Sequence, residues 1–247
     1  MNVNREKPPF DNGDLRRAMT LSLDRKAFID ILSEGQGNVG GVLQPPPAGS
    51  WGMPPEVLQT LPGYDPDVQK SRLQARQIME KLGFGPEHRL KVKVSTRDIP
   101  PYPAVILIDQ LKDVYTDGEL ETIDTTNWFP KIMRKDFVVG LNLTPGFVDD
   151  PDPTFYANYV CGAEANFNGY CNPEVDMLVD QQSMEPDPQK RKKLVWEIER
   201  KLAEDGARPI IFYGRGATCW QPYVKGLTVM VNSIFNGWRM EEVWLDR

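Results

Sequence analysis

Apolar residues recur at helical spacing in two stretches near the start of the chain. Over residues 14–34 they gather on one face, and Asp24 predicts a break or a second cap within the stretch. The second stretch has Asp65 as its expected N-cap, Pro66 as its first helical residue and Gly83 as its end. The pattern therefore predicts an interrupted helix followed by a long continuous one.

Residues 35–63 separate these helices, and here Gly and Pro interrupt every periodic pattern. Pro45-Pro46-Pro47 and Pro54-Pro55 both fall in this part, and neither a long helix nor a central strand tolerates such runs. We expect an irregular wrap with one short helical turn at 56–60.

Strand and helix patterns alternate in the middle of the chain. Residues 90–95 and 119–125 alternate between apolar and polar positions, and 137–143 is typical of a buried strand. Helical stretches at 103–115 and 128–134 lie between them. This β-α-β-α-β order predicts an α/β fold, a mixed sheet with helices packed on it.

The remaining residues carry two more helical patterns and two apolar runs. Helices are expected at 173–183 and over 187–206, where an Asp-Pro pair opens the second one and a Gly closes it. Residues 209–213 and 227–231 have the composition of strands.

Composition narrows the classes of function. Of the 247 residues, 40% are hydrophobic and 26% are charged, as in globular proteins. The apolar runs are far shorter than the roughly 18 to 20 residues that a membrane span needs. A net charge of -6 and a pI near 5.0 argue against nucleic acid as a partner. Residues 1–14 do not have the pattern of a secretion signal.

Three cysteines and one histidine leave few options for metal or nucleophilic chemistry. The Cys and His spacing does not fit a zinc site, and no nucleophile motif pairs with His88, which is expected in an exposed turn. Cys161 and Cys171 can form a disulfide worth roughly 2.5 to 3 kcal/mol. Such a bond implies an oxidising compartment, so we expect the chain to be part of a longer exported precursor. Cys219 is expected to be a free, largely buried thiol.

Residues 35–40 match the G-x-G-x-x-G spacing of dinucleotide sites. The match follows a helix rather than a strand and leads into Pro45-Pro46-Pro47, which cannot open the helix that binds the phosphates. We therefore expect no nucleotide cofactor.

The acidic run Asp149-Asp150-Pro151-Asp152 allows three interpretations. Two close carboxylates can be the acid and base of a hydrolase. Clustered acids can also bind calcium, although the Gly and the distal Glu of a calcium loop are absent from this run. In the third interpretation, Asp150 or Asp152 caps a helix that begins near Pro153.

Arg97 stands just after the predicted strand at 90–95, ahead of an Asp-Ile-Pro-Pro turn. A guanidinium at such an edge can hold a ligand carboxylate with two hydrogen bonds, or it can be a surface residue with no ligand. Trp128 and Phe147 supply aromatic side chains near the later loops, either to the core or to a ligand platform.

Several short segments occur in a recognisable order along most of the chain. In sequence they are Pro8-Pro-Phe-Asp, Leu23-Asp-Arg-Lys-Ala, Leu43-Gln-Pro-Pro, Tyr64-Asp-Pro-Asp, Asp150-Pro-Asp, Asn172-Pro-Glu-Val-Asp and Val224-Lys-Gly-Leu. This series resembles the family 5 extracellular solute-binding proteins, the dipeptide, oligopeptide and nickel binders of ABC importers.

The resemblance implies a lobe of the periplasmic-binding-protein type II kind, with the carboxy-terminal half of the whole protein represented here. Residues 1–63 would be a helical entry and wrap, 64–206 an α/β core, and 207–247 closing strands that return toward a missing amino-terminal lobe. It also implies a periplasmic location, a peptide or other small-molecule ligand enclosed between the lobes, and a membrane permease of an ABC transporter as partner.

Site residues follow from the same resemblance. In peptide-binding members an Arg after the first strand of this lobe holds the ligand carboxylate, and Arg97 occupies that place. An Asp ahead of the Asp-Pro-Asp segment holds the ligand's amino group, but Phe147 or Val148 aligns with it here, unless Asp149 takes the contact. The full expected wall is Arg97, Trp128, Asn142, Thr144, Phe147, Asp149 and Asp150. Catalysis, a cofactor and a metal are not expected; an extracytoplasmic hydrolase that uses Asp149 and Asp150 is the alternative.

Overall fold

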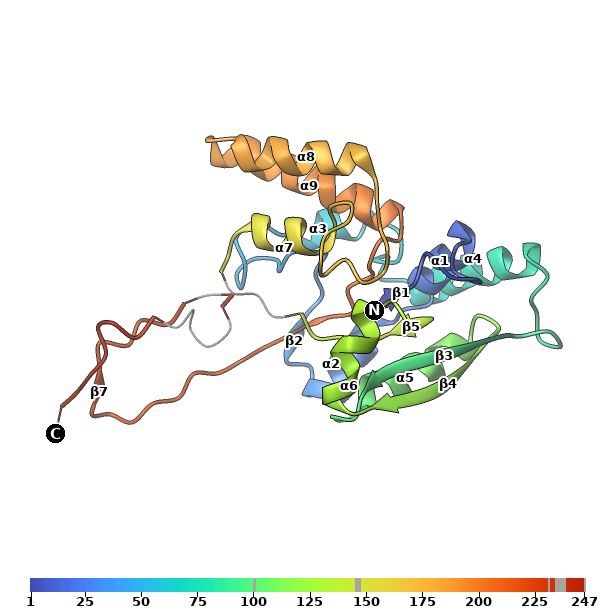
Figure 1. Ribbon diagram of the computed structural model, residues 1–247, viewed down its shortest axis with the longest axis horizontal. Helices are drawn as coiled ribbons and strands as arrows, with labels where there is room; N and C mark the ends of the chain where they lie inside the picture. Colours follow the sequence, from blue (N-terminus) through green and yellow to red (C-terminus); the bar gives the residue numbers. More distant parts are fainter. Residues whose placement is uncertain (100, 145–147, 231, 234–238, 247) are drawn as a thin grey trace.

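The computed structural model describes residues 1–99, 101–144, 148–230, 232–233 and 239–246. Its centre is a four-stranded mixed sheet in the order β1-β5-β3-β4. Helices lie on both faces of this sheet, and a second group of helices forms a layer of its own (Figure 1). The predicted α/β fold with a mixed sheet is therefore confirmed.

The chain enters through β1 (Asn2–Val3) and continues into α1 (Gly13–Leu21) and α2 (Arg25–Ser33). Asp24 separates the two helices, because its backbone is extended and its side chain accepts a hydrogen bond of 2.9 Å from the Ala27 backbone N–H. The predicted break at this aspartate is confirmed.

The wrap, residues 35–63, contains little regular structure, as predicted. It holds the short strand β2 (Gly37–Asn38) and one helical turn, α3 (Pro55–Leu58). β2 pairs antiparallel with β6 (Tyr213–Gly214), which ties the wrap to the last part of the chain.

The α/β core follows in the predicted order. Its elements are α4 (Val68–Lys81), β3 (Leu90–Arg97), α5 (Tyr102–Lys112), β4 (Thr116–Ile123), α6 (Thr125–Met133) and β5 (Val139–Gly140). β3 pairs in parallel with β4 and β5, and β1 pairs antiparallel with β5. The carboxyl ends of three parallel strands therefore meet at one edge of the sheet.

A single apolar core holds this part together. Val94 of β3, Leu107 and Leu111 of α5, and Ala75 and Met79 of α4 are at most 1% exposed and belong to one cluster. Burial of each such side chain contributes about 1.5 to 3 kcal/mol for the larger residues.

Several predicted boundaries in the core are wrong. The strand expected at 119–125 and the helix expected at 128–134 begin earlier, at Thr116 and Thr125. α4 begins at Val68, because Asp67 accepts the capping hydrogen bond from the Lys70 backbone N–H at 3.0 Å, whereas Asp65 receives the Asp67 backbone N–H. The strand expected at 137–143 shrinks to two residues, since its neighbour β1 is only two residues long and the chain then leaves the sheet.

A second core lies in the helical layer of α7 (Pro151–Asn158), α8 (Pro173–Met184) and α9 (Pro188–Glu204). Each helix has an Asp or Asn N-cap followed by Pro at its first position. The buried side chains that join the helices are Phe155, Tyr159, Val175, Val179, Val195, Ile198 and Leu202.

Beyond β6 the chain leaves the body as an extended arm, defined here as the described residues between 215 and 246 (Figure 1, orange to red). Its regular structure among the described residues is the pair β7 (Val224–Lys225) and β8 (Trp244–Leu245). The strand predicted at 209–213 is therefore wrong except at its last residue, and none forms over the described residues of 227–231. Strand composition alone does not place a partner strand beside an apolar run.

Candidate functional site

The carboxyl edge of the sheet presents a cationic side chain. Arg97 is the last residue of β3, is half-buried, and lies with its guanidinium carbon 5.9 Å from the centre of the Phe129 ring. Among the described residues, no carboxylate oxygen lies within 4 Å of its nitrogens. The guanidinium is thus held at a strand end without an anionic partner in the part of the chain that the structure describes.

Asn142 lies beside this edge and is oriented by a buried tryptophan. Ser95 pairs with Gly140, so two residues further on Arg97 and Asn142 leave the sheet at the same edge. Trp128 is fully buried with Ile132 and Phe137, and its Nε1 donates a hydrogen bond of 3.3 Å to Asn142 Oδ1. The structure therefore places Trp128 behind Asn142 rather than on an open surface.

Thr144 is exposed, and its hydroxyl accepts a hydrogen bond from Arg208 Nη2. Phe147, the aromatic residue expected on this wall, lies outside the described residues.

The carboxylate of Asp149 is engaged on both oxygens. Oδ2 accepts from the Ser50 backbone N–H at 2.9 Å, and Oδ1 accepts from Asn232 Nδ2 at 2.9 Å. Its carbonyl oxygen accepts from Trp51 Nε1 at 3.0 Å. Asp149 therefore joins the wrap and the arm to the loop that precedes α7.

Asp150 is engaged in the same way, by α7 and α9. Its side chain caps α7 by accepting from the Asp152 backbone N–H at 2.9 Å, as the capping interpretation predicts. Arg191 donates to both of its oxygens, at 2.9 and 3.0 Å, and the same guanidinium reaches Asp152 at 3.1 Å and stacks on Trp51. Neither Asp149 nor Asp150 is positioned as a free acid or base, so the hydrolase interpretation has no support.

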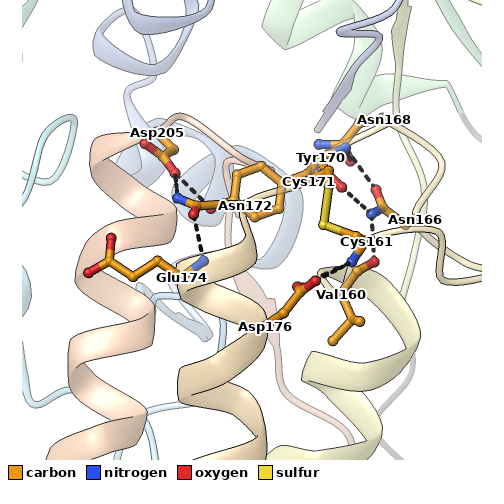
Figure 2. The surroundings of a disulfide bond; sticks show 10 residues. All are labelled: Val160, Cys161, Asn166, Asn168, Tyr170, Cys171, Asn172, Glu174, Asp176 and Asp205. Atoms are coloured by element: carbon orange, nitrogen blue, oxygen red, sulfur yellow. Dashed lines mark hydrogen bonds between the residues drawn. A yellow bond between two sulfur atoms is a disulfide. The ribbon is translucent and has the colours of Figure 1, made fainter.

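The predicted disulfide joins Cys161 and Cys171, whose Cα atoms are 4.4 Å apart, and it links the end of α7 to the start of α8 (Figure 2). Asp176 accepts from the Cys161 backbone N–H at 3.2 Å, and the Asn166 side chain bonds the carbonyl oxygens of Val160 and Tyr170. Figure 2 shows Asp176 reaching from α8 to the Cys161 backbone, and the Asn166 side chain between Val160 and Tyr170.

Cys219 is free, as expected, but it is exposed, so the prediction of a buried thiol is wrong. The residue lies on the arm and belongs to neither of the two buried cores.

One buried acid that contacts the wrap, Glu199 of α9, was not predicted from the sequence. Glu199 is 2% exposed, and its carboxylate accepts the backbone N–H groups of Leu43 at 2.9 Å and Met53 at 3.1 Å. Burial raises its pKa from 4.5 to about 7. A Cβ on Gly41 would lie 2.5 Å from Glu199 Oε1, so a larger residue there would have to displace this carboxylate. The signal was present in the sequence, because position 199 lies on the apolar face of α9 defined by Val195, Ile198 and Leu202.

Glu199 lines a small cavity together with two buried arginines, Arg25 and Arg208. Arg25 donates from Nε to the Ile210 carbonyl at 2.8 Å and lies over the Tyr64 ring at 3.9 Å. Neither arginine was recognised from sequence, although Arg208 directly precedes an apolar run, where a charged residue is unusual.

The described residues include no group of three or more His, Cys, Asp and Glu side chains arranged to hold a metal ion. None of the helices formed by those residues has the length and apolar character needed to span a bilayer.

Comparison with known proteins matches residues 1–166 to the family model described as bacterial extracellular solute-binding proteins, family 5 middle. The oligopeptide-binding protein OppA of Bacillus subtilis is 25% identical over 217 residues, which are 85% of this chain and 39% of that protein. Haemophilus influenzae OppA, solved with the peptide RPPGFSPFR, superposes with a TM-score of 0.78 at 20% identity, over 100% of this chain and 48% of that one.

A third relative is the ABC transporter-associated periplasmic binding protein DppA of Helicobacter pylori, solved in complex with the peptide STSA. It gives a TM-score of 0.79 at 17% identity and covers 100% of this chain and 46% of its own. The chain thus shares the fold of these proteins and spans less than half the length of each.

Proposed function

The chain belongs to the bacterial extracellular solute-binding proteins of family 5, and we propose that it forms the carboxy-terminal lobe of a two-lobe protein that captures a peptide-like or other small organic solute for an ABC importer. The observation that carries this proposal is Arg97, a half-buried guanidinium at the end of β3 without an anionic partner among the described residues. Such a group can hold a ligand carboxylate with two charge-assisted hydrogen bonds.

The surroundings of Arg97 favour a ligand with an apolar body. Ile99, Tyr102, Phe129 and Leu143 are between 44% and 76% exposed, and all four lie in segments at or just after the ends of the strands. Ligand pockets are lined mostly by apolar and aromatic side chains around a few polar groups. We propose Arg97, Asn142 and Thr144 as the polar contacts and Phe147 as a further apolar one.

We propose that three further residues of the expected wall position the site without contacting the ligand: Trp128, Asp149 and Asp150. Trp128 orients Asn142, whereas Asp149 and Asp150 fix the ends of the wrap, α7 and α9 around it. The carboxylates of Asp149 and Asp150 both have partners within the chain, so we propose that the amino end of a peptide is recognised elsewhere.

The three-part division of the chain also stays a proposal. Residues 1–63 and 64–206 form the packed body, and 207–247 contain the arm, in which Trp220, Tyr223, Trp244 and Leu245 are between 46% and 56% exposed. Exposed apolar groups of this size mark surfaces that bind another surface. We propose that the amino-terminal lobe covers them.

The same proposal places the protein in the periplasm or on the outer side of the cell membrane, with a membrane permease as its partner. The disulfide between Cys161 and Cys171 supports this location, because such bonds persist in oxidising compartments.

The test uses the two-lobe protein that contains this chain, with thermal unfolding measured in the presence of defined di- to pentapeptides and a matched panel of sugars. A ligand that binds only the native state raises the melting temperature by mass action. We expect a rise with at least one peptide and no rise with the same peptide when its carboxyl end is amidated. A rise with sugars alone would contradict the role of Arg97, and no rise with any compound would contradict peptide capture.

A further inference from the structure

The segment that leads out of the helical layer, residues 207–210, is called the exit segment here, and three parts of the body hold its backbone. The Ala207 carbonyl accepts from Asn168 Nδ2 in the disulfide-closed loop. The Pro209 carbonyl accepts from the nitrogen of Met1 at 2.8 Å, and the Ile210 carbonyl accepts from Arg25 Nε at 2.8 Å. The exit segment is therefore fixed against β1, α2 and the loop between α7 and α8.

The side chain of Arg208 points from this segment to the strand-end segment, residues 141–144. Its guanidinium is buried, with the whole residue 6% exposed. Nη1 donates to Asn158 Oδ1 at 2.6 Å and Nη2 donates to Thr144 Oγ1. The Asn158 amide is itself fixed, because its Nδ2 donates to the Thr154 carbonyl at 2.9 Å within α7.

Both acceptors of Arg208 are neutral, and no carboxylate oxygen of the described residues lies within 4 Å of its nitrogens. A buried charge whose hydrogen-bond donors lose their partners is costly. Thr144 itself is exposed. If its hydroxyl moved away, Nη2 of Arg208 would lose its acceptor or become exposed to solvent. The place of Thr144 is thereby tied to the place of Arg208.

A second hydrogen bond, from Trp128 Nε1 to Asn142 Oδ1, holds the other end of the strand-end segment to the core. The two anchors differ in kind. Trp128 belongs to the sheet body, whereas Arg208 belongs to the segment that continues into β6 and the arm.

We propose that Arg208 is a positioning residue that couples the exit segment to the strand-end segment through the Thr144 hydroxyl. The inference rests on the proposed function, in which 141–144 lines the ligand site and the chain beyond the exit segment reaches the other lobe. Because the exit segment is itself fixed to the body, Arg208 holds the Thr144 hydroxyl in one place at the ligand site.

Hydrogen exchange in the 247-residue chain, without any ligand, tests this coupling separately from solute capture. Thr144→Val removes the acceptor while keeping the shape of an exposed side chain, and Arg208→Gln removes the charged donors. We expect each variant to raise the exchange rate of amides in 141–144 at least five-fold, and the double variant to raise it no further than the stronger single one. Arg200→Gln, which breaks an exposed ion pair with Glu204 elsewhere on α9, is the control and should leave these amides within two-fold of the parent.

A rise below five-fold in Thr144→Val, or effects that multiply in the double variant, would overturn the coupling. Thr144→Val keeps the test valid even if Arg208→Gln fails to fold. In the two-lobe protein, the affinity for a peptide identified by thermal unfolding should fall at least ten-fold in Arg208→Gln and be partly restored in Arg208→Lys. An unchanged affinity in Arg208→Gln would also overturn the coupling. If no peptide of the panel raises the melting temperature, that result contradicts solute capture, and the hydrogen-exchange result alone decides the coupling.

Discussion

Arg191 holds the carboxylate of Asp150 with two hydrogen bonds, from Nη2 to Oδ1 at 2.9 Å and from Nη1 to Oδ2 at 3.0 Å. Asp150 is also the N-cap of α7, so one side chain joins the start of α7 to the first turn of α9. Asp150 was predicted to be a ligand-binding or catalytic group, and in this structure it links α7 to α9.

Removal of this pair should destabilise the fold. We expect Arg191→Met to lower the free energy of unfolding by about 1 to 2 kcal/mol. A partly buried ion pair with two hydrogen bonds stabilises a fold more than an exposed ion pair does. Chemical denaturation measures the change. Arg200→Met breaks the exposed pair with Glu204 and is the control, with an expected loss of about 0.5 kcal/mol or less. Equal losses in the two variants would show that the Asp150 contact has no special weight.

The disulfide should contribute measurably to stability, because it closes a loop between Cys161 and Cys171. Reduction, or the double variant Cys161→Ser and Cys171→Ser, is expected to lower the free energy of unfolding by about 2.5 to 3 kcal/mol. A thiol reagent should find one reactive thiol in the native, unreduced protein, since Cys219 is exposed. Three reactive thiols would contradict the pairing, and none would contradict the exposure of Cys219.

Glu199 should make stability fall as pH rises. Its pKa is raised from 4.5 to about 7 by burial, so between these values the folded protein binds a proton that the unfolded chain has released. The group therefore favours folding most below about pH 4.5, and this contribution is lost by about pH 7, an effect of about 3 kcal/mol.

The comparison of parent and Glu199→Gln isolates that effect from the other carboxylates. Denaturation at several pH values should show the stability of the parent decreasing relative to the variant between pH 4.5 and pH 7. A difference between the two proteins that does not change with pH would mean that Glu199 is ionised throughout, stabilised by the backbone N–H groups of Leu43 and Met53.

Arg97 should dominate recognition of an anionic ligand. In the two-lobe protein, Arg97→Ala is expected to weaken binding of a peptide with a free carboxylate by roughly 2 to 5 kcal/mol if the contact is buried. Asp149→Ala should weaken binding of a cationic ligand less, because both oxygens of Asp149 are used within the chain. A larger loss from Asp149→Ala in calorimetric titrations would identify the ligand as amine-bearing and contradict this assignment.

The sequence predicted the elements of the body better than the site. Periodicity and capping residues located α2, α8 and α9 within a residue or two, because caps such as Asp24 and Asp187 act on their own neighbours. The length of β5 depends on its partner β1, more than 130 residues away in sequence, and no local pattern records it.

The site was harder to predict for the same reason. Spacing places Arg97 at a strand end, but the partners of Asp149 come from the wrap and the arm, and those of Asp150 come from α9. Trp128 matched an aromatic ligand platform in sequence, whereas the sheet and α6 bury it completely. Such long-range contacts decide whether a polar or aromatic residue faces a ligand or the protein.

The central claim is that solute is enclosed between two lobes, of which this chain supplies one. Calorimetric titration of a peptide that stabilises the two-lobe protein measures it most directly, with that protein and the 247-residue chain titrated side by side. We expect submicromolar binding by the two-lobe protein and no binding tighter than about 100 μM by the chain alone, because the opposite wall that desolvates the ligand is absent. Submicromolar binding by the chain alone would contradict the claim.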